Sequence, residues 1–233
     1  MTSNIRQTDT WLSLGLAFVG GYGDAAGFVL AKTFTGHVTG NLVLGAIAAT
    51  AHDWWNMVGH LSAIVTFLMG VVLSMLIVRT LKAWPSWPFL PTVMGIEVIL
   101  IVAAALALES GMALRVEIFV IFLSLALGLQ NGAFRRVGGI TVHTTYLTGM
   151  ITSLISTEAE NYISGFPPTL VGVLDPKISL LCRIWIAFFV GAGVGAAMVF
   201  HFNGFGMLGA AVLLITLVLY VPKDSPMLLR NVV

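Results

Sequence analysis

The sequence predicts an all-α integral membrane protein, with six full transmembrane helices plus two re-entrant half-helices in two inverted repeats. The first observation is composition: 58% of the 233 residues are hydrophobic and only 9% are charged, against about 25% charged in an ordinary soluble domain. The mean hydropathy is +0.99. The second observation is that the apolar stretches are of two lengths, and the third is an uneven distribution of Lys and Arg. We treat residues 1–233 as a single transmembrane domain.

Six apolar stretches are long enough to cross the membrane, because a bilayer core about 30 Å thick takes about 20 residues of α-helix. The first of them is expected to be a retained span, because one Arg precedes it within the first ten residues and no A-x-A cleavage pattern follows it. The six stretches cover 11–31, 58–82, 91–109, 113–135, 178–201 and 204–221.

Two further apolar stretches, Leu42–Ala51 and Leu147–Thr157, cover only about half of the core at 1.5 Å per residue. The first ends in His52-Asp53 and the second runs into the acidic segment 158–161. Neither can therefore be extended through hydrocarbon at low cost. We expect a short helix within 38–52 and another within 145–163.

The distribution of Lys and Arg decides between crossing and re-entrant short segments, because cytoplasmic connections are enriched in these residues. If all eight stretches crossed, the two faces would receive six and five of the eleven Lys and Arg residues. If the short segments enter and leave on the same face, one face keeps only Lys32 and Arg115. The other nine then share one face: Arg6, Arg79, Lys82, Arg135, Arg136, Lys177, Arg183, Lys223 and Arg230. This bias predicts six spans with both termini in the cytoplasm, and eight thin spans are the main alternative.

Three similarities in the same order indicate an internal repeat, with one half at about 11–109 and the other at about 113–221. The GYGDA segment around Asp24 matches the GLQNG segment around Asn131, and a Thr-Gly pair follows each. Phe67-x-x-Gly70-x-x-x-Ser74 then matches Phe188-x-x-Gly191-x-x-x-Gly195. With three crossings and one re-entrant segment in each half, the two halves are inverted, as in many transport proteins.

Such a repeat predicts a meeting point at the centre of the bilayer. The chain would enter as an extended stretch, 33–38 or 141–146, and return as a half-helix that begins near the midplane. Unpaired N–H groups and positive dipole ends would then favour an anion or a polar neutral solute. We expect Thr39 and Thr148 to be N-caps, with Gly40 and Gly149 allowing close approach. The alternative is that each Thr-Gly pair only packs two tight helix starts together.

Four motifs resemble those of the YoaK-like family of bacterial multi-pass membrane proteins. They are GxxDxxGF in the first span, Phe34-Thr35-Gly36-His37-Val38-Thr39-Gly40-Asn41, the QNGA segment at 130–133 and TTYLTG at 144–149. The resemblance covers about 12–221. It implies residence in the bacterial inner membrane and names no substrate, because the family has no established activity. In the family an Arg usually stands where this sequence has His143, which puts in doubt a mechanism that needs a permanent cation there.

Two carboxyl side chains lie deep in predicted spans. Asp24 near the middle of the first span would cost at least about 2.5 kcal/mol if it were ionised in hydrocarbon. It either carries a coupling proton or binds solute, or it accepts hydrogen bonds from the exposed N–H groups of a half-helix as a structural cap. Asn131 suits a hydrogen-bonding role at the equivalent position. Glu97 also requires a partner, and the candidates are the Thr-Gly region, His37 and Arg183.

His37 precedes the first Thr-Gly pair and corresponds to Tyr146 in the second. Its ordinary pKa near 6.5 suits proton relay or donation to an anionic solute. We expect no metal ion at His37, because His52 and His60 fall beyond the half-helix at the far interface. No cofactor is expected, and nothing in the composition or charge predicts nucleic-acid binding.

These features predict a transporter or channel for a small solute, an anion or a polar neutral molecule, with proton coupling left open. The alternatives are a non-transporting scaffold or accessory subunit and, less favoured, an intramembrane enzyme, for which no HExxH or GxSxG motif is present. The expected partners are the lipid bilayer and the solute, and a homodimer is compatible with the Gly-rich sequence. The predicted pathway residues are Asp24, His37, Thr39, Gly40, Asn41, Glu97, Gln130, Asn131, Tyr146, Thr148 and Gly149.

Overall fold

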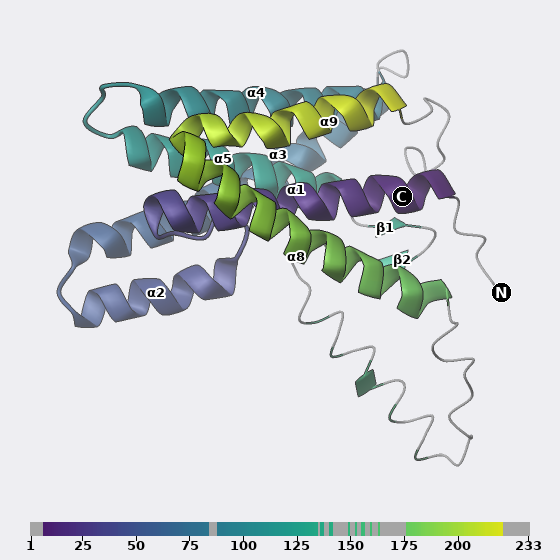
Figure 1. Cartoon of the computed structure of the whole chain (residues 1–233), viewed down its shortest axis with the longest axis horizontal. Helices are drawn as coiled ribbons and strands as arrows, with labels where there is room; N and C mark the ends of the chain where they lie inside the picture. Colours follow the sequence, from purple (N-terminus) through teal and green to yellow (C-terminus); the bar gives the residue numbers. More distant parts are fainter. Residues whose placement is uncertain are drawn as a thin grey trace.

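The structure is a computed structural model that describes residues 7–83, 88–134, 136–137, 140–141 and 176–220, with a few isolated positions between 149 and 163. In the described parts the chain forms a bundle of apolar helices (Figure 1). The helices are α1 (Gln7–Ala31), α2 (Val38–Thr50), α3 (Trp54–Ala83), α4 (Phe89–Glu109), α5 (Arg115–Ala133), α8 (Pro176–Phe202) and α9 (Leu208–Tyr220), with the 3₁₀ segment η1 (Asn203–Met207) between the last two.

Five helical stretches in the described residues are apolar and long enough to cross a membrane. The last of them, Ser179–Tyr220, is 42 residues long and contains both α8 and α9. Large hydrophobic side chains on α3 and α8 lie exposed, among them Leu68 and Phe189. Exposed Leu and Phe along helices of this length are suited to a lipid environment. The chain is therefore a helical multi-pass membrane protein.

The long helices alternate in direction (Figure 1). The chain runs from one end of the molecule to the other in α1, returns in α3 and continues back and forth through α4, α5, α8 and α9. The first residues of α1 and the last residues of α9 therefore lie at the same end. The short helix α2 runs in the same direction as α1, beside the far end of the bundle.

Of the two predicted short helices, the first is present as α2, whose 13 residues begin at Val38, four residues earlier than the apolar stretch suggested. At 1.5 Å per residue it is about 20 Å long, well short of a bilayer core. The second predicted short helix, within 145–163, lies outside the described residues. The all-α prediction missed one small feature: β1 (Arg136–Val137) and β2 (Ile140–Thr141) form a two-stranded antiparallel ladder.

The most extensive helix contacts join α1 to α8 and α3 to α5. Each pair is packed through glycine. A Cβ placed on Gly21 of α1 would lie 2.1 Å from the carbonyl oxygen of Phe188 on α8, and a Cβ on Gly128 of α5 would lie 2.1 Å from the carbonyl oxygen of Phe67 on α3. Small residues allow this close approach of helix backbones in membranes.

Each of the two interfaces contains a second close contact, in which the glycine belongs to the other helix of the pair. A Cβ on Gly191 of α8 would lie 2.1 Å from the carbonyl oxygen of Phe18, and a Cβ on Gly70 of α3 would lie 2.3 Å from that of Leu125. Phe18 and Leu125 each stand three residues before the glycine of their own helix. Both interfaces therefore use the same pattern of contacting positions.

Long-range hydrogen bonds hold α1 inside this bundle. The hydroxyl of Tyr22 donates to the carbonyl oxygen of Gly206 in η1, and the side-chain amide of Gln130 on α5 donates to the carbonyl oxygen of Leu16 at 3.0 Å. Leu12, Leu16 and other α1 side chains are fully buried in the hydrophobic core. Helix α1 is thus packed against α5, α8 and α9 together.

Candidate functional site

The candidate site is the connection between α1 and α2, residues 32–37, where no helix forms. Helix α1 stops at Ala31, and Lys32 adopts a positive φ of 55°, a conformation that ends helices and that only a few residue types adopt without strain. The chain then folds back along α1, so that Thr35 contacts Gly23 and Asp24, before α2 begins at Val38. The backbone N–H and C=O groups of this connection need partners other than a helix.

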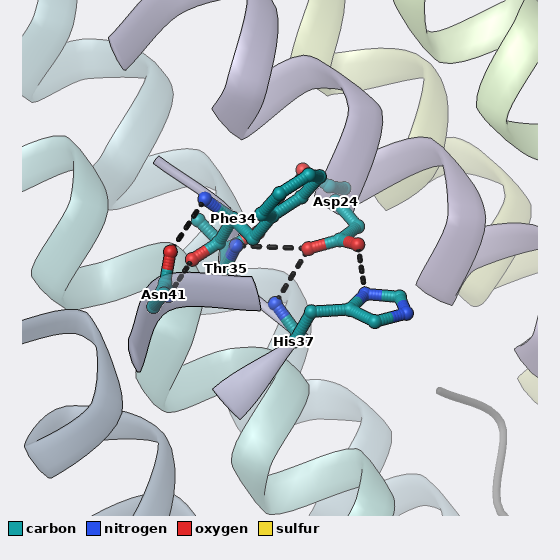
Figure 2. A network of polar contacts seen from close by, with 7 residues as sticks. Asp24, Phe34, Thr35, His37 and Asn41 are labelled. Carbon is teal, nitrogen blue, oxygen red and sulfur yellow. Dashed lines mark hydrogen bonds and ion pairs between the residues drawn. The ribbon is translucent and has the colours of Figure 1, made fainter. Parts of the chain in front are cut away.

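Asp24 of α1 supplies the partner for two of these N–H groups (Figure 2). Its Oδ1 atom accepts a hydrogen bond from the backbone N–H of Thr35 at 2.9 Å and another from that of Gly36 at 2.7 Å. Its Oδ2 atom pairs with Nδ1 of His37. The carboxyl group is almost completely buried. Both oxygens of Asp24 are therefore engaged in fixing the connection.

Asn41 fixes the same connection from α2. Its Oδ1 atom accepts the backbone N–H of Phe34 at 3.0 Å, and its Nδ2 atom donates to the carbonyl oxygen of Phe34 at 2.6 Å. Asn41 thus replaces both backbone partners that Phe34 would have in regular structure. The Oγ1 atom of Thr35 completes the network by donating to the carbonyl oxygen of Gly23 at 3.1 Å.

His37 stands at the border of the network. It is the N-cap residue of α2, with extended φ and ψ of −113° and 95°, and its side chain makes no capping hydrogen bond to the helix. The imidazole packs against the rings of Phe34 and, from α8, Phe188. It exposes 36% of its side chain, whereas Asp24 exposes 6%. The hydrogen bond to Asp24 raises the pKa of His37, which lies outside the candidate spans, and the partial burial of the ring opposes this rise.

The prediction that Thr39 is the N-cap of the first half-helix is wrong. His37 holds that position, so Thr39 lies in the first turn, with an exposed side chain. A Cβ on Gly40 would lie 2.9 Å from Cδ2 of Phe34, so a side chain at this position would require the Phe34 ring to shift. The first backbone hydrogen bond of α2 runs from Asn41 N–H to the carbonyl oxygen of His37, which leaves the preceding N–H groups at the helix start without this kind of bond.

Of the remaining predicted site residues, Gln130 and Asn131 lie on α5, outside the connection between α1 and α2. Gln130 is buried and binds Leu16, so it joins helices. Asn131 is half-buried on α5, and its Oδ1 atom has no hydrogen-bond partner in the described part of the chain. Tyr146 and Thr148 lie outside the described residues. Of the second Thr-Gly pair, only the partly buried, helical Gly149 is described.

Glu97 contradicts the expectation of a partner. It lies on α4, is fully buried, and neither carboxyl oxygen accepts or donates a hydrogen bond within the described residues. His37 is paired with Asp24, and the side chain of Arg183 is exposed. Of the candidate partners, His37 and Arg183 are therefore not bound to Glu97, and Thr148 of the second Thr-Gly pair lies outside the described residues.

Sequence reasoning also missed two participants. Nδ1 of His60 on α3 lies 3.3 Å from Oγ1 of Thr33 in the connection, although His60 was expected at the far interface, away from the motif. The second participant is the backbone of Phe34, which Asn41 binds at both ends. No local sequence pattern predicts either contact, because each contact joins residues from different elements.

Comparison with known proteins gives a family and one relative. A family model described as "Protein of unknown function (DUF1275)" matches residues 12–221. The chain is also similar to the UPF0700 transmembrane protein YoaK of Bacillus subtilis (strain 168), with 31% identity over 151 residues that cover 63% of this chain. The match spans 65% of the length of that relative, slightly less than two thirds. No solved structure gives a significant match.

Proposed function

The chain belongs to the DUF1275 family of proteins of unknown function, and we propose that it is a membrane transporter or channel for a small solute. The solute is an anion or a polar neutral molecule, and its pathway passes His37 and the first turn of α2. The observation that carries the proposal is the repeated glycine packing of α1 on α8 and of α3 on α5.

The two interfaces support an inverted repeat. Gly21 and Gly128 were matched from sequence, as were Phe67 and Phe188. A Cβ added to either glycine would lie 2.1 Å from the carbonyl oxygen of the matched Phe in the other half. The first helices of the two proposed halves, α1 and α5, run in opposite directions (Figure 1). Two inverted halves that enclose a central site are a common design of transport proteins.

The geometry of α2 supports a re-entrant segment. It follows α1 in the same direction, is too short to cross, and is followed by α3 in the opposite direction. A chain that crosses in α1 and in α3 and reverses within 32–50 enters and leaves on one face. The start of α2 then lies within the membrane, where irregular backbone is tolerated only if it is buried in protein or lines a wet cavity.

The chemistry of the connection narrows the solute class. The carboxyl group of Asp24 already accepts two N–H groups and pairs with His37, so it has little capacity to hold a cation. The half-exposed imidazole of His37 and the uncapped first turn of α2 offer donors. Donors at a helix start favour anions and acceptor groups of neutral solutes.

The test is solute flux into liposomes that contain the purified protein. The probes are chloride, formate, phosphate, urea and glycerol. The variant is Thr39→Cys in a Cys182→Ser background, since Cys182 is the only cysteine of the chain. We expect flux of at least one probe and its loss after a thiol reagent is added. Cysteine at Thr50, at the opposite end of α2, is the matched control and should leave flux unchanged. Absence of flux for every probe would contradict the proposal.

A second function, a non-transporting scaffold, has one specific observation in its favour. Asp24 and Asn41 are both occupied by backbone groups of the connection, which is the pattern expected of purely structural polar residues. The two functions differ in the flux assay. A scaffold gives no flux and copurifies with a partner from its native membrane.

We place the protein in the inner membrane of a bacterium, with both termini in the cytoplasm, and we do not propose an enzymatic activity. The distribution of Lys and Arg supports this orientation. Lys32 follows the end of α1 and Arg115 begins α5, whereas Arg79 lies near the end of α3, Arg136 lies in β1 after α5, and Arg183 lies near the start of α8. The solute, the lipid bilayer and a second copy of the chain are the proposed partners. Labelling of single cysteines in cells by an impermeant thiol reagent tests the orientation.

A further inference from the structure

Glu97 and Asp24 both carry buried carboxyl groups, but the two groups differ in the number of hydrogen-bond partners around them. Asp24 has two N–H donors and an imidazole as partners. Glu97 is fully buried, and both of its oxygens lack a hydrogen-bond partner among the described residues. The negative charge of a carboxylate is stabilised at Asp24 by donors and is not stabilised at Glu97.

The surroundings of Glu97 are apolar. On its own helix, Val93, Met94 and Ile101 stand three or four residues away, on the same face, and all are fully buried. Helix α4 packs against α5, α9, η1 and, less extensively, α3. Glu97 stands near the middle of α4 (Phe89–Glu109) and therefore near the middle of the bilayer.

The helices that pack on α4 bring no counter-charge to its middle turns. The titratable groups of α5, Arg115 and Glu117, stand in its first turn, and α9 has only Tyr220 at its last position. Helix η1 has none. On α3, His60 binds Thr33 and Arg79 is exposed, while Lys82 is near the helix end. On α4 itself, Glu109 accepts the N–H of Gly204 at the far end.

We propose that Glu97 is a proton-binding site inside the membrane, whose ligand is H⁺ itself. The neutral carboxylic acid is the form that an apolar, unpaired position accepts, because an isolated charge in hydrocarbon is expensive. Glu97 is then the group that gains and loses a proton, whereas the Asp24 carboxyl group is engaged in the hydrogen bonds of the connection. The inference rests on the proposed function in one respect: a solute carrier would couple the solute to this proton.

Infrared spectroscopy at pH 7 of the protein purified in a detergent that has no carbonyl group tests the site. A protonated carboxyl group gives a C=O stretching band that is distinct from carboxylate bands and shifts in D₂O. We expect this band in the wild type, its loss in Glu97→Gln, and its retention in Glu109→Gln, the matched change at the end of the same helix. Glu97→Asp keeps an acid and should keep a band at a shifted frequency, which guards against misfolding of the Gln variant.

The outcomes separate this inference from the proposed function. A wild type without the band, or a Glu97→Gln variant that keeps it, would overturn the proton site whatever the flux assay shows. A band that depends on Glu97 establishes the site without reference to any solute. If the band is present and no probe is transported, the transport proposal fails and the proton site stands.

Discussion

Gly21 on α1 and Phe188 on α8 lie backbone against backbone, so closely that a Cβ on Gly21 would stand 2.1 Å from the carbonyl oxygen of Phe188. No side chain can relieve this contact, because both groups belong to helix backbones. Gly128 and Phe67 make the equivalent contact between α5 and α3. The stability of the bundle therefore depends on hydrogen atoms at these two positions.

Gly21→Ala and Gly128→Ala should each destabilise the protein by about 1–3 kcal/mol or more, the usual cost of forcing extra volume into a packed interior. Gly193→Ala is the matched control, because nothing lies within 4 Å of a Cβ there, and Ala is a better helix former by about 1 kcal/mol. The midpoint of thermal unfolding in detergent, followed by tryptophan fluorescence, measures the difference. Equal midpoints for the Gly21 and Gly193 variants would contradict the packing described here.

Removal of the Asp24 carboxyl group should loosen the connection. Asp24→Ala leaves the N–H groups of Thr35 and Gly36 unpaired, at about 1–3 kcal/mol for each buried donor. Asp24→Asn keeps one oxygen as an acceptor and should lose less, since the bonds to a charged acceptor are the stronger ones. Asp53→Ala, which removes an exposed contact with Asn56, should lose least. A different order of unfolding midpoints would argue against the role of Asp24.

The Asp24–His37 pair predicts a pH-dependent contribution to stability. The hydrogen bond to Asp24 raises the pKa of His37 in the folded protein, so protonated His37 stabilises the fold fully below its ordinary value of about 6.5. This contribution is lost as the pH rises through the raised pKa. The unfolding midpoint of the wild type should exceed that of His37→Gln most at pH 6 and least at pH 9. His201→Gln serves as control, and a gap that grows with pH would refute the pair.

Asn41→Ala should free both backbone groups of Phe34. The loss of two hydrogen bonds of about 1 kcal/mol each predicts amide exchange in residues 33–37 that is roughly ten-fold faster or more. Hydrogen–deuterium exchange with mass spectrometry measures this directly. Thr50→Ala, at the other end of α2, removes only a bond to Ile47 and is the control. Exchange that rises equally throughout α1 would indicate global loosening instead of a local role.

Much of the fold follows from apolar length alone. The long helices, the short helix α2 and the break after Ala31 were predicted, because a bilayer sets the length of a crossing helix and charged ends limit its extension. The exact start of α2 was not predicted. Thr39 is the better N-cap by residue type. However, Asp24 binds His37 and the two residues before it, and this long-range network makes His37 the N-cap of α2.

The partners of polar residues could not be predicted for the same reason. Asp24 was expected to carry a proton, to bind solute or to accept N–H groups. In the structure its Oδ1 atom accepts two N–H groups. The isolation of Glu97 depends on the absence, in the described part of the chain, of charged groups near it on four elements packed against α4, namely α3, α5, α9 and η1. The glycine motifs predicted close packing, but not that α1 would pair with α8, from the other half of the chain, as its most extensive neighbour.

The hydroxyl of Tyr22 and the carbonyl of Gly206, which bind each other across 184 positions of sequence, impose an order on biosynthesis. When α1 leaves the ribosome and enters the bilayer, the helices that cover its glycine face have not been translated, and chains fold from their amino-terminal segments onward as they are made. Helix α1 therefore lies in the membrane without its contacts to α8 and η1 until these segments are made. A membrane-insertion chaperone that binds α1 until α8 and η1 are inserted would protect the helix during this interval. Truncation before α8 should leave the chain open to membrane proteases.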